Sequence, residues 1–236
     1  ENHRMVFEKQ ASKLITKYGL PLADADDIFD IFQSLGIVKW KMSESPMLVS
    51  DYLKKGLSLA EEVDLKYLLR EEVATFIDPK GNFFKGFRFA GHYDGTVVFT
   101  LLPGNLVVVC AEFMHGCEDV VLELPGGMLE TGEDPASRAK KEFEDETGVI
   151  LKNVIPLGLK GTTYFARRLN SRCYAFLGVV PDPVIIGKQK LDDSEYLEVV
   201  LVHLKDWLKL IDKEKVDCKS IIATFKALRK LGLIKT

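Results

Sequence analysis

The chain has 236 residues, of which 47% are apolar and 28% are charged, and its formal net charge at pH 7 is −3. This composition indicates a globular protein with one good core. The small charge argues against nucleic acid or an anionic membrane as the main partner. No apolar run approaches the roughly 20 residues that span a bilayer, and the first residues do not resemble a secretory signal. Four cysteines without C-x-x-C spacing predict reduced thiols in a cytoplasm rather than zinc or a disulfide framework.

The first 40 residues are predicted to form a helical extension. Apolar residues at helical spacing indicate an amphipathic helix over residues 3–19, and Pro21 separates it from a second helix over 24–35 that ends at Gly36. Such a hairpin could cap the core, pair two subunits or bind another partner, and the sequence leaves these roles open. Residues 41–64 are ambiguous.

From about residue 66 the pattern changes to strands rich in β-branched and aromatic residues, separated by Gly- and Pro-containing turns. The predicted strands are 67–77, 83–90, 96–102, 106–113, 120–124, 154–159, 172–180 and 196–203, and the predicted last helix is 219–231. A carboxylate-bearing helix lies between the two groups of strands. This order predicts a mixed α/β sandwich.

The most informative segment is 123–149, ELPGGMLETGEDPASRAKKEFEDETGV. Pro135 suits the first position of a helix and Gly148 its C-terminal cap. On this helix Glu142, Asp145 and Glu146 share one turn, so their carboxylates point the same way. Carboxylates this close either hold a hard cation such as Mg²⁺ or Mn²⁺ or belong to a solvated acidic face.

The spacing decides between these interpretations. Gly127, five residues, Glu133, seven residues and then KEFEDETGV from Lys141 resemble the Nudix box, G-x5-E-x7-R-E-U-x-E-E-x-G-U with U apolar. Lys141 stands where the pattern has arginine, and Asp145 where it has glutamate. The resemblance implies a Nudix-type α/β/α sandwich with a mixed sheet, preceded by the helical extension. The domain would cover residues 41–236, with its core from about 66.

The resemblance also implies a metal site and its surroundings. Glu142 and Glu146 would be the main ligands of Mg²⁺, or of Mn²⁺, and Glu133 would pair with Lys141 to brace the loop. Two further metal contacts are implied, from the Asp145 side chain and from the Gly126 carbonyl. The acidic stretch 192–199 resembles a loop that supplies a catalytic base or completes the metal site. The candidates there are Glu195 first and Asp193 second.

The flanks of the box narrow the substrate class. The ELPGG opening is similar to that of ADP-ribose pyrophosphatases, which implies hydrolysis of ADP-ribose or an ADP- or NDP-sugar and is compatible with a homodimer. Residues 112–114 depart from that group's usual Gln-Tyr-Arg. Candidate substrate contacts are Tyr164 or Phe165 for stacking on an adenine, and Arg167 or Arg168 for a phosphate or carboxylate. The sequence equally allows a core aromatic and surface arginines at these positions. Dinucleoside polyphosphates, NADH and coenzyme A stay open as substrates, as does a non-catalytic sensor of nucleotide sugars.

Overall fold

The computed structural model describes residues 15–39, 70–77, 81, 83–90, 94–114, 117–130, 132–158, 160–163, 171–191 and 196–235. The strands are β1 (Leu22–Ala23), β2 (Arg70–Ile77), β3 (Phe83–Ala90), β4 (Asp94–Leu102), β5 (Leu106–Met114), β6 (Asp119–Glu123), β7 (Met128–Leu129), β8 (Asn153–Pro156), β9 (Thr162–Thr163), β10 (Arg172–Val179) and β11 (Leu197–His203). The helices are α2 (Ile28–Leu35), α5 (Pro135–Thr147), α6 (Leu204–Asp212) and α7 (Cys218–Lys230).

Among the described residues, one large mixed sheet forms the centre of the molecule. Its strand order is β1-β11-β5-β4-β10-β8, with β6 against β5, β7 against β4 and β9 against β10. β4 and β5 form an antiparallel hairpin, whereas β10 runs parallel to β4. Each predicted strand is confirmed in the described residues, although its ends shift by up to three positions.

Alternate side chains of the sheet face two different layers. In β4, Val97 and Phe99 are fully buried in one apolar cluster, while Val98 is fully buried in another. This is the two-residue alternation that a strand imposes on its side chains. A sheet that buries apolar side chains on both faces needs a layer of helices on each.

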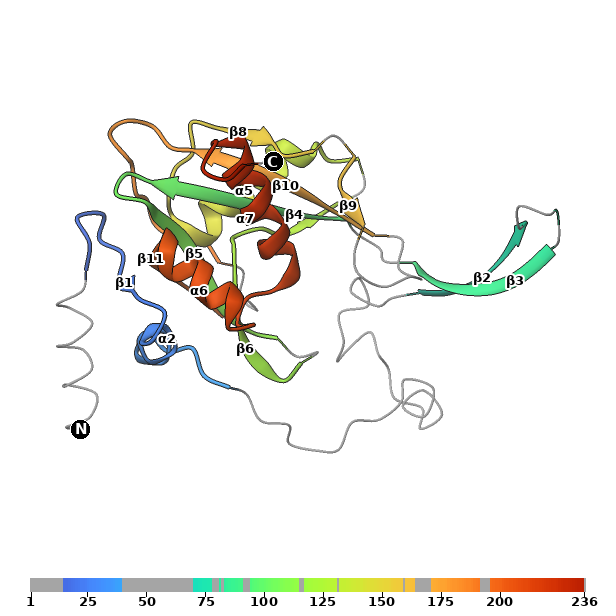
Figure 1. Cartoon of the computed structure of the whole chain (residues 1–236), viewed down its shortest axis with the longest axis horizontal. Coiled ribbons are helices and arrows are strands. Elements are labelled where there is room, and N and C mark those ends of the chain that lie inside the picture. The colour runs from blue at the N-terminus through green and yellow to red at the C-terminus, as the bar shows by residue number, and fades with distance from the viewer. Residues whose placement is uncertain are drawn as a thin grey trace.

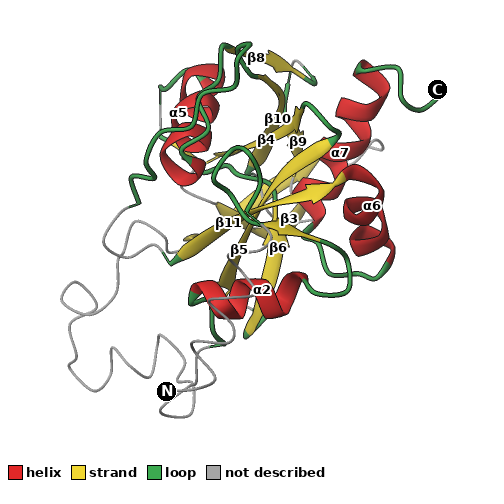
Figure 2. Cartoon of the chain, turned by 90° about the vertical axis from the view of Figure 1, so that its left-hand side faces the viewer, coloured by secondary structure: helices red, strands yellow, loops and turns green. Residues whose placement is uncertain are grey.

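The helices supply those two layers. Phe32 of α2, Trp207 of α6 and Leu228 of α7 belong to the first cluster, whereas Ala139 and Phe143 of α5 belong to the second. In Figure 2 the strands run between α5 on one side and α6 and α7 on the other. The predicted α/β/α sandwich with a mixed sheet is therefore confirmed.

The N-terminal segment is only partly as predicted. Helix α2 ends at Gly36 as expected but begins at Ile28, after a turn over Asp24–Asp27. The predicted helix over 3–19 is wrong for its last residues, because Ile15 forms a bridge with Pro21 across a turn. Residues 1–14 and 40–69 lie outside the described residues. Since Ile28 packs in the same cluster as the sheet, α2 forms part of the sandwich, and the domain boundary near residue 40 stays a prediction.

Strands β2 and β3 form a second sheet of their own. Their antiparallel register runs from Arg70 opposite Ala90 to Ile77 opposite Phe83. Figure 1 shows this ribbon projecting from the side of the sandwich. A ribbon of two strands is marginally stable in water by itself.

Among the residues that the structure describes, no helix combines the length and apolarity that crossing a bilayer requires.

Candidate active site

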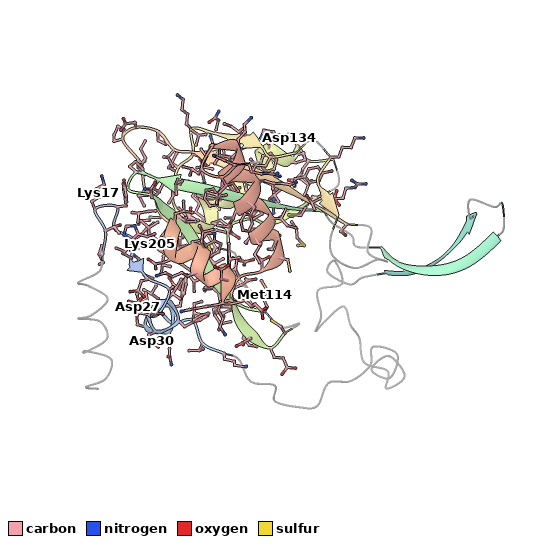
Figure 3. All side chains as sticks on the ribbon, in the orientation of Figure 1. Lys17, Asp27, Asp30, Met114, Asp134 and Lys205 are labelled. Carbon is pink, nitrogen blue, oxygen red and sulfur yellow. The ribbon has the colours of Figure 1, made fainter. Side chains whose placement is uncertain are left out.

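Helix α5 is set at both ends by its own sequence. Asp134 precedes it, and the Asp134 Oδ2 atom accepts hydrogen bonds from the Ser137 backbone N–H and hydroxyl, each at 2.8 Å. Pro135 opens the helix, and Gly148 ends it with a φ of 70°, a left-handed conformation that glycine adopts without strain. Asp134 lies at the surface of the molecule (Figure 3). These residues fix where the helix begins and ends, whereas its apolar residues Ala139 and Phe143 set which side meets the sheet.

Two of the predicted carboxylates lie on the buried side of α5. Glu142 is 9% exposed and Glu146 is 8% exposed, one turn apart, beside the apolar Phe143. The Glu146 Oε2 atom accepts a hydrogen bond of 2.8 Å from the Gly126 N–H. Glu142 packs against Gly127, where an added Cβ would lie 2.5 Å from its Oε2 atom. The structure therefore brings Gly126, Glu142 and Glu146 together, as the spacing of the box predicts.

The two glycines are needed for space. Gly127 O accepts from Thr96 N, and Pro125 O accepts from Val98 N, each at 2.8 Å, which ties the loop to β4. A Cβ on Gly126 would overlap the Thr96 carbonyl oxygen. Neither glycine has a positive φ, so it is the lack of a side chain, and not an unusual backbone angle, that this loop requires. Without side chains, Gly126 and Gly127 let the loop pass between the backbone of β4 and the Glu142 side chain of α5.

The pKa of the Glu146 carboxyl is raised well above its usual value. Burial is the largest cause, and the Glu123 and Glu142 carboxylates add to it, while the Gly126 hydrogen bond and Lys219 act in the other direction. A buried anion beside like charges favours either a proton or a cation. The local electrostatics thus favour binding of a cation at this place.

Helix α7 supports the same loop from the other side of the sheet. The Ser220 hydroxyl accepts a buried hydrogen bond of 2.7 Å from the Leu124 N–H. The Lys219 Nζ atom lies 2.8 Å from Glu123 Oε2, and the Glu123 side chain is almost fully buried. Sequence reasoning missed Lys219 and Ser220, because 96 residues separate each from its partner and no local pattern marks them.

The predicted pair of Glu133 and Lys141 is wrong. The Lys141 Nζ atom lies 3.0 Å from Asp145 Oδ2, and this hydrogen bond raises the pKa of Lys141. Glu133 is instead approached by Arg138, whose Nη1 atom is 3.8 Å from Glu133 Oε1. The reason is helical geometry, since residues four apart face each other and Lys141 therefore meets Asp145.

Asp145 lies at the rim of the site between two lysines. Besides Lys141, the Lys190 Nζ atom is 3.7 Å from Asp145 Oδ1. Among the described residues, no group of three His, Cys, Asp or Glu side chains is arranged to hold a metal ion. The candidate ligands among the described residues are therefore Glu142 and Glu146 with the backbone of the loop. This suffices for Mg²⁺, which is commonly bound by one or two carboxylates and keeps several waters.

The remaining predicted site residues are Tyr164, Phe165, Arg167, Arg168, Asp193 and Glu195, and all six lie outside the described residues. The first four fall between β9 and β10, which pair through Thr163 and Arg172. The last two fall between Leu191 and Tyr196. The chain just before Leu191 is tied to α5, because Lys190 N donates to Asp145 O and the Gln189 side chain donates to Glu146 O, each at 2.7 Å.

Comparison with known proteins decides the family. The NUDIX domain profile matches residues 92–223, more than half of the chain. The chain belongs to the Nudix family. Together with its relatives, this makes the protein a Nudix hydrolase. A divalent metal ion is general in such hydrolases, and the buried carboxylates of α5 fit that requirement.

Three relatives and one solved structure are similar to this Nudix protein. The ADP-ribose pyrophosphatase of Bacillus subtilis (strain 168) is 31% identical over 56% of this chain and 70% of its own length. The methanol dehydrogenase activator of Bacillus methanolicus is 28% identical over the same shares. The ADP-ribose pyrophosphatase of Saccharomyces cerevisiae is 24% identical over 74% of this chain and 78% of its own. A crystal structure of an ADP compounds hydrolase has a TM-score of 0.60 at 16% identity, covering 71% of this chain and 90% of that one, and it establishes the fold.

Proposed function

We propose that the protein is a Mg²⁺-dependent pyrophosphatase that hydrolyses the diphosphate bond of a nucleoside diphosphate derivative. ADP-ribose, or an ADP- or NDP-sugar, is the favoured substrate, and the products are a nucleoside monophosphate and a phosphorylated moiety. The observation that carries the proposal is the pair of buried carboxylates, Glu142 and Glu146, packed against Gly126 and Gly127. Two of the similar relatives are named ADP-ribose pyrophosphatases.

Three groups of the chain would hold the metal. Glu142 and Glu146 provide carboxylate oxygens, and the Gly126 carbonyl is supported because the carbonyls on either side of it are directed to β4 while its own N–H faces Glu146. When bound, Mg²⁺ neutralises the charge of the diphosphate and lowers the pKa of a bound water. Asp145 adds negative charge at the rim, where its two lysines would have to give way for direct coordination.

The loop 192–195 is the proposed source of the catalytic base. Glu195, with Asp193 as second choice, would take a proton from the attacking water, which adds to phosphorus as the bond to the bridging oxygen breaks. The ties from Gln189 and Lys190 to the last turn of α5 support this role, because they hold the start of that loop beside Glu146. Glu195 could also complete the metal site.

Substrate binding is assigned to the segment between β9 and β10. An aromatic ring at Tyr164 or Phe165 would stack on the base, and Arg167 or Arg168 would meet a phosphate or carboxylate.

We infer further that two copies of the chain associate. The β2–β3 ribbon supports this inference, because a sheet of two strands buries little surface by itself. Sedimentation of the purified protein tests the dimer directly.

The test is hydrolysis of a panel of substrates with and without Mg²⁺. The panel holds ADP-ribose, ADP-glucose, UDP-glucose, diadenosine polyphosphates, NADH and coenzyme A. The expected result is turnover of ADP-ribose or a nucleotide sugar that requires the metal and is lost in Glu146→Gln. Turnover of diadenosine polyphosphates, NADH or coenzyme A alone would move the proposal to that class.

A second candidate is a nucleotide-binding regulator. It is favoured by the similarity to a protein named as a methanol dehydrogenase activator. Binding of a nucleotide sugar without turnover of any compound in the panel would support this candidate.

A further inference from the structure

Arg138 occupies a position to which the Nudix box assigns no residue type. It precedes Lys141 by three residues and Glu142 by four. On a helix, residues four apart face each other, whereas adjacent residues do not. Arg138 is therefore on the same side of α5 as Glu142, and Lys141 is not.

The contacts of Arg138 link the loop before α5 to the carboxylates on it. Its Nη2 atom forms an ion pair with Glu142 Oε1, and its Nη1 atom is 3.8 Å from Glu133 Oε1. Glu133 in turn accepts a hydrogen bond of 2.9 Å from the Glu130 N–H through Oε2. The Arg138 side chain is only 22% exposed, compared with 64% for Lys141. The guanidinium thus joins a loop and a helix side chain in a largely buried place.

The two oxygens of Glu142 have different surroundings. Oε1 meets the guanidinium of Arg138, whereas Oε2 lies against Gly127. The residue before Gly127, Gly126, donates its N–H to Glu146. A carboxylate held at one oxygen presents the other in a fixed direction. Removing a residue that hydrogen-bonds to a metal ligand and orients it typically weakens metal affinity by about 10- to 100-fold.

We propose that Arg138 is the positioning residue that orients Glu142 for the metal, in place of the arginine that the box pattern has at position 141. This inference rests on the proposed function, since it assigns Glu142 to the metal. Lys141 cannot take the role, because it pairs with Asp145. Arg138 also offers a planar fork of donors, which a lysine does not.

The sign of the effect separates positioning from simple charge. Arg138 is a cation, so by Coulomb's law alone its removal would strengthen the binding of another cation nearby. If Arg138 orients Glu142, its removal has the opposite effect and weakens metal binding. The direction of the change in affinity therefore decides the matter.

The test measures Mn²⁺ binding to the full chain by electron paramagnetic resonance, without nucleotide. Arg138→Met keeps an apolar stem and removes the guanidinium, and we expect it to weaken Mn²⁺ binding by about 10- to 100-fold. Arg138→Lys should fall between Arg138→Met and the wild type. The matched control is Lys140→Ala, which removes another cation of α5 and its ion pair with Glu144, and it should not weaken binding.

Unchanged or tighter Mn²⁺ binding in Arg138→Met would overturn the inference. Thermal unfolding without metal checks that the variants are folded, and if Arg138→Met is not, Arg138→Lys decides by the same criterion. Because no substrate is present, the outcome is independent of the substrate panel. A wild type that binds no Mn²⁺ would instead contradict the metal site of the proposed function.

Discussion

Helices α5 and α7 cover opposite faces of the sheet and are built alike, but they bury different side chains. Each has 13 residues, packs on one face of the sheet and begins after an aspartate that caps the N–H of a serine three residues later, Asp134 with Ser137 and Asp217 with Ser220. Their buried sides differ. That of α7 holds Ser220, Ala223, Thr224, Ala227 and Leu228, whereas that of α5 holds two glutamates, Glu142 and Glu146, beside Ala139, Phe143 and Thr147.

The difference teaches which features belong to the fold and which to the function. The buried side chains of α7 are neutral, and the buried carboxylate next to this helix, Glu123, is paired with Lys219. In α5 the Glu146 carboxylate is buried near the carboxylates of Glu123 and Glu142, and an anion removed from water in this way destabilises the folded state. Residues that oppose stability in this way are typical of sites that bind or catalyse.

The largest effect is expected from Glu146→Gln. The variant keeps the shape and the acceptor for Gly126 N–H but removes the charge that would hold the metal. Metal ions supply several kcal/mol of transition-state stabilisation, so hydrolysis should fall by about a thousandfold, or about 4 kcal/mol. Steady-state kinetics at saturating Mg²⁺ measures this. Glu144→Gln, on the same helix, is the control and should retain activity; equal losses in both variants would count against the comparison.

Gly126→Ala comes next. The added methyl group would overlap the Thr96 carbonyl, and overpacking of this kind typically destabilises by about 1–3 kcal/mol. Urea unfolding measures the loss, and activity should fall with it because the loop moves away from Glu146. Gly158→Ala is the control, since among the described residues its Cβ would meet Lys226 Nζ alone, at 3.5 Å. A fully stable, fully active Gly126→Ala would show that the close approach is not required.

Ser220→Ala tests the support that α7 gives the loop. It leaves the buried Leu124 N–H without its acceptor, which typically reduces the free energy of unfolding by about 1–3 kcal/mol. Urea unfolding should record that loss in the absence of metal. If α7 supports the loop, Ser220→Ala should lower activity more than Thr224→Val does. If α7 only covers the sheet, the two substitutions should lower activity equally.

The smallest effect is a pH dependence at Asp217. Burial is the largest cause of its raised pKa, so the folded state binds this proton more tightly than the unfolded state does. The contribution of this proton to the free energy of unfolding is therefore fully present below the usual pKa of about 3.8, and it is lost as pH rises through the higher pKa of the folded state. Asn caps a helix about as well as Asp and does not titrate. Urea unfolding of Asp217→Asn should thus show a gain in stability over wild type that grows from pH 3 to pH 7; a gain independent of pH would refute this.

Sequence reasoning found the local features and missed the distant ones. The caps of α5, the strands and the facing of Glu142 and Glu146 follow from periodicity and turn residues within a short window. Helix α6 carries a comparable signal in Leu204, Trp207 and Leu210, which recur at three-residue spacing. By contrast, Lys219 and Ser220 act across 96 residues, and the partner of Glu133 depended on which side of α5 each cation occupies.

The central claim is that the buried Glu146 carboxylate of α5 serves a metal ion and opposes stability without it. The most direct measurement is the unfolding temperature of wild type and of Glu146→Gln, each with EDTA and with Mg²⁺. Glu146→Gln should be the more stable protein in EDTA, and Mg²⁺ should stabilise the wild type by about 2.7 kcal/mol at 100 times its dissociation constant and the variant much less. Equal stabilisation of both proteins by Mg²⁺, or a variant that is less stable than wild type in EDTA, would contradict the claim.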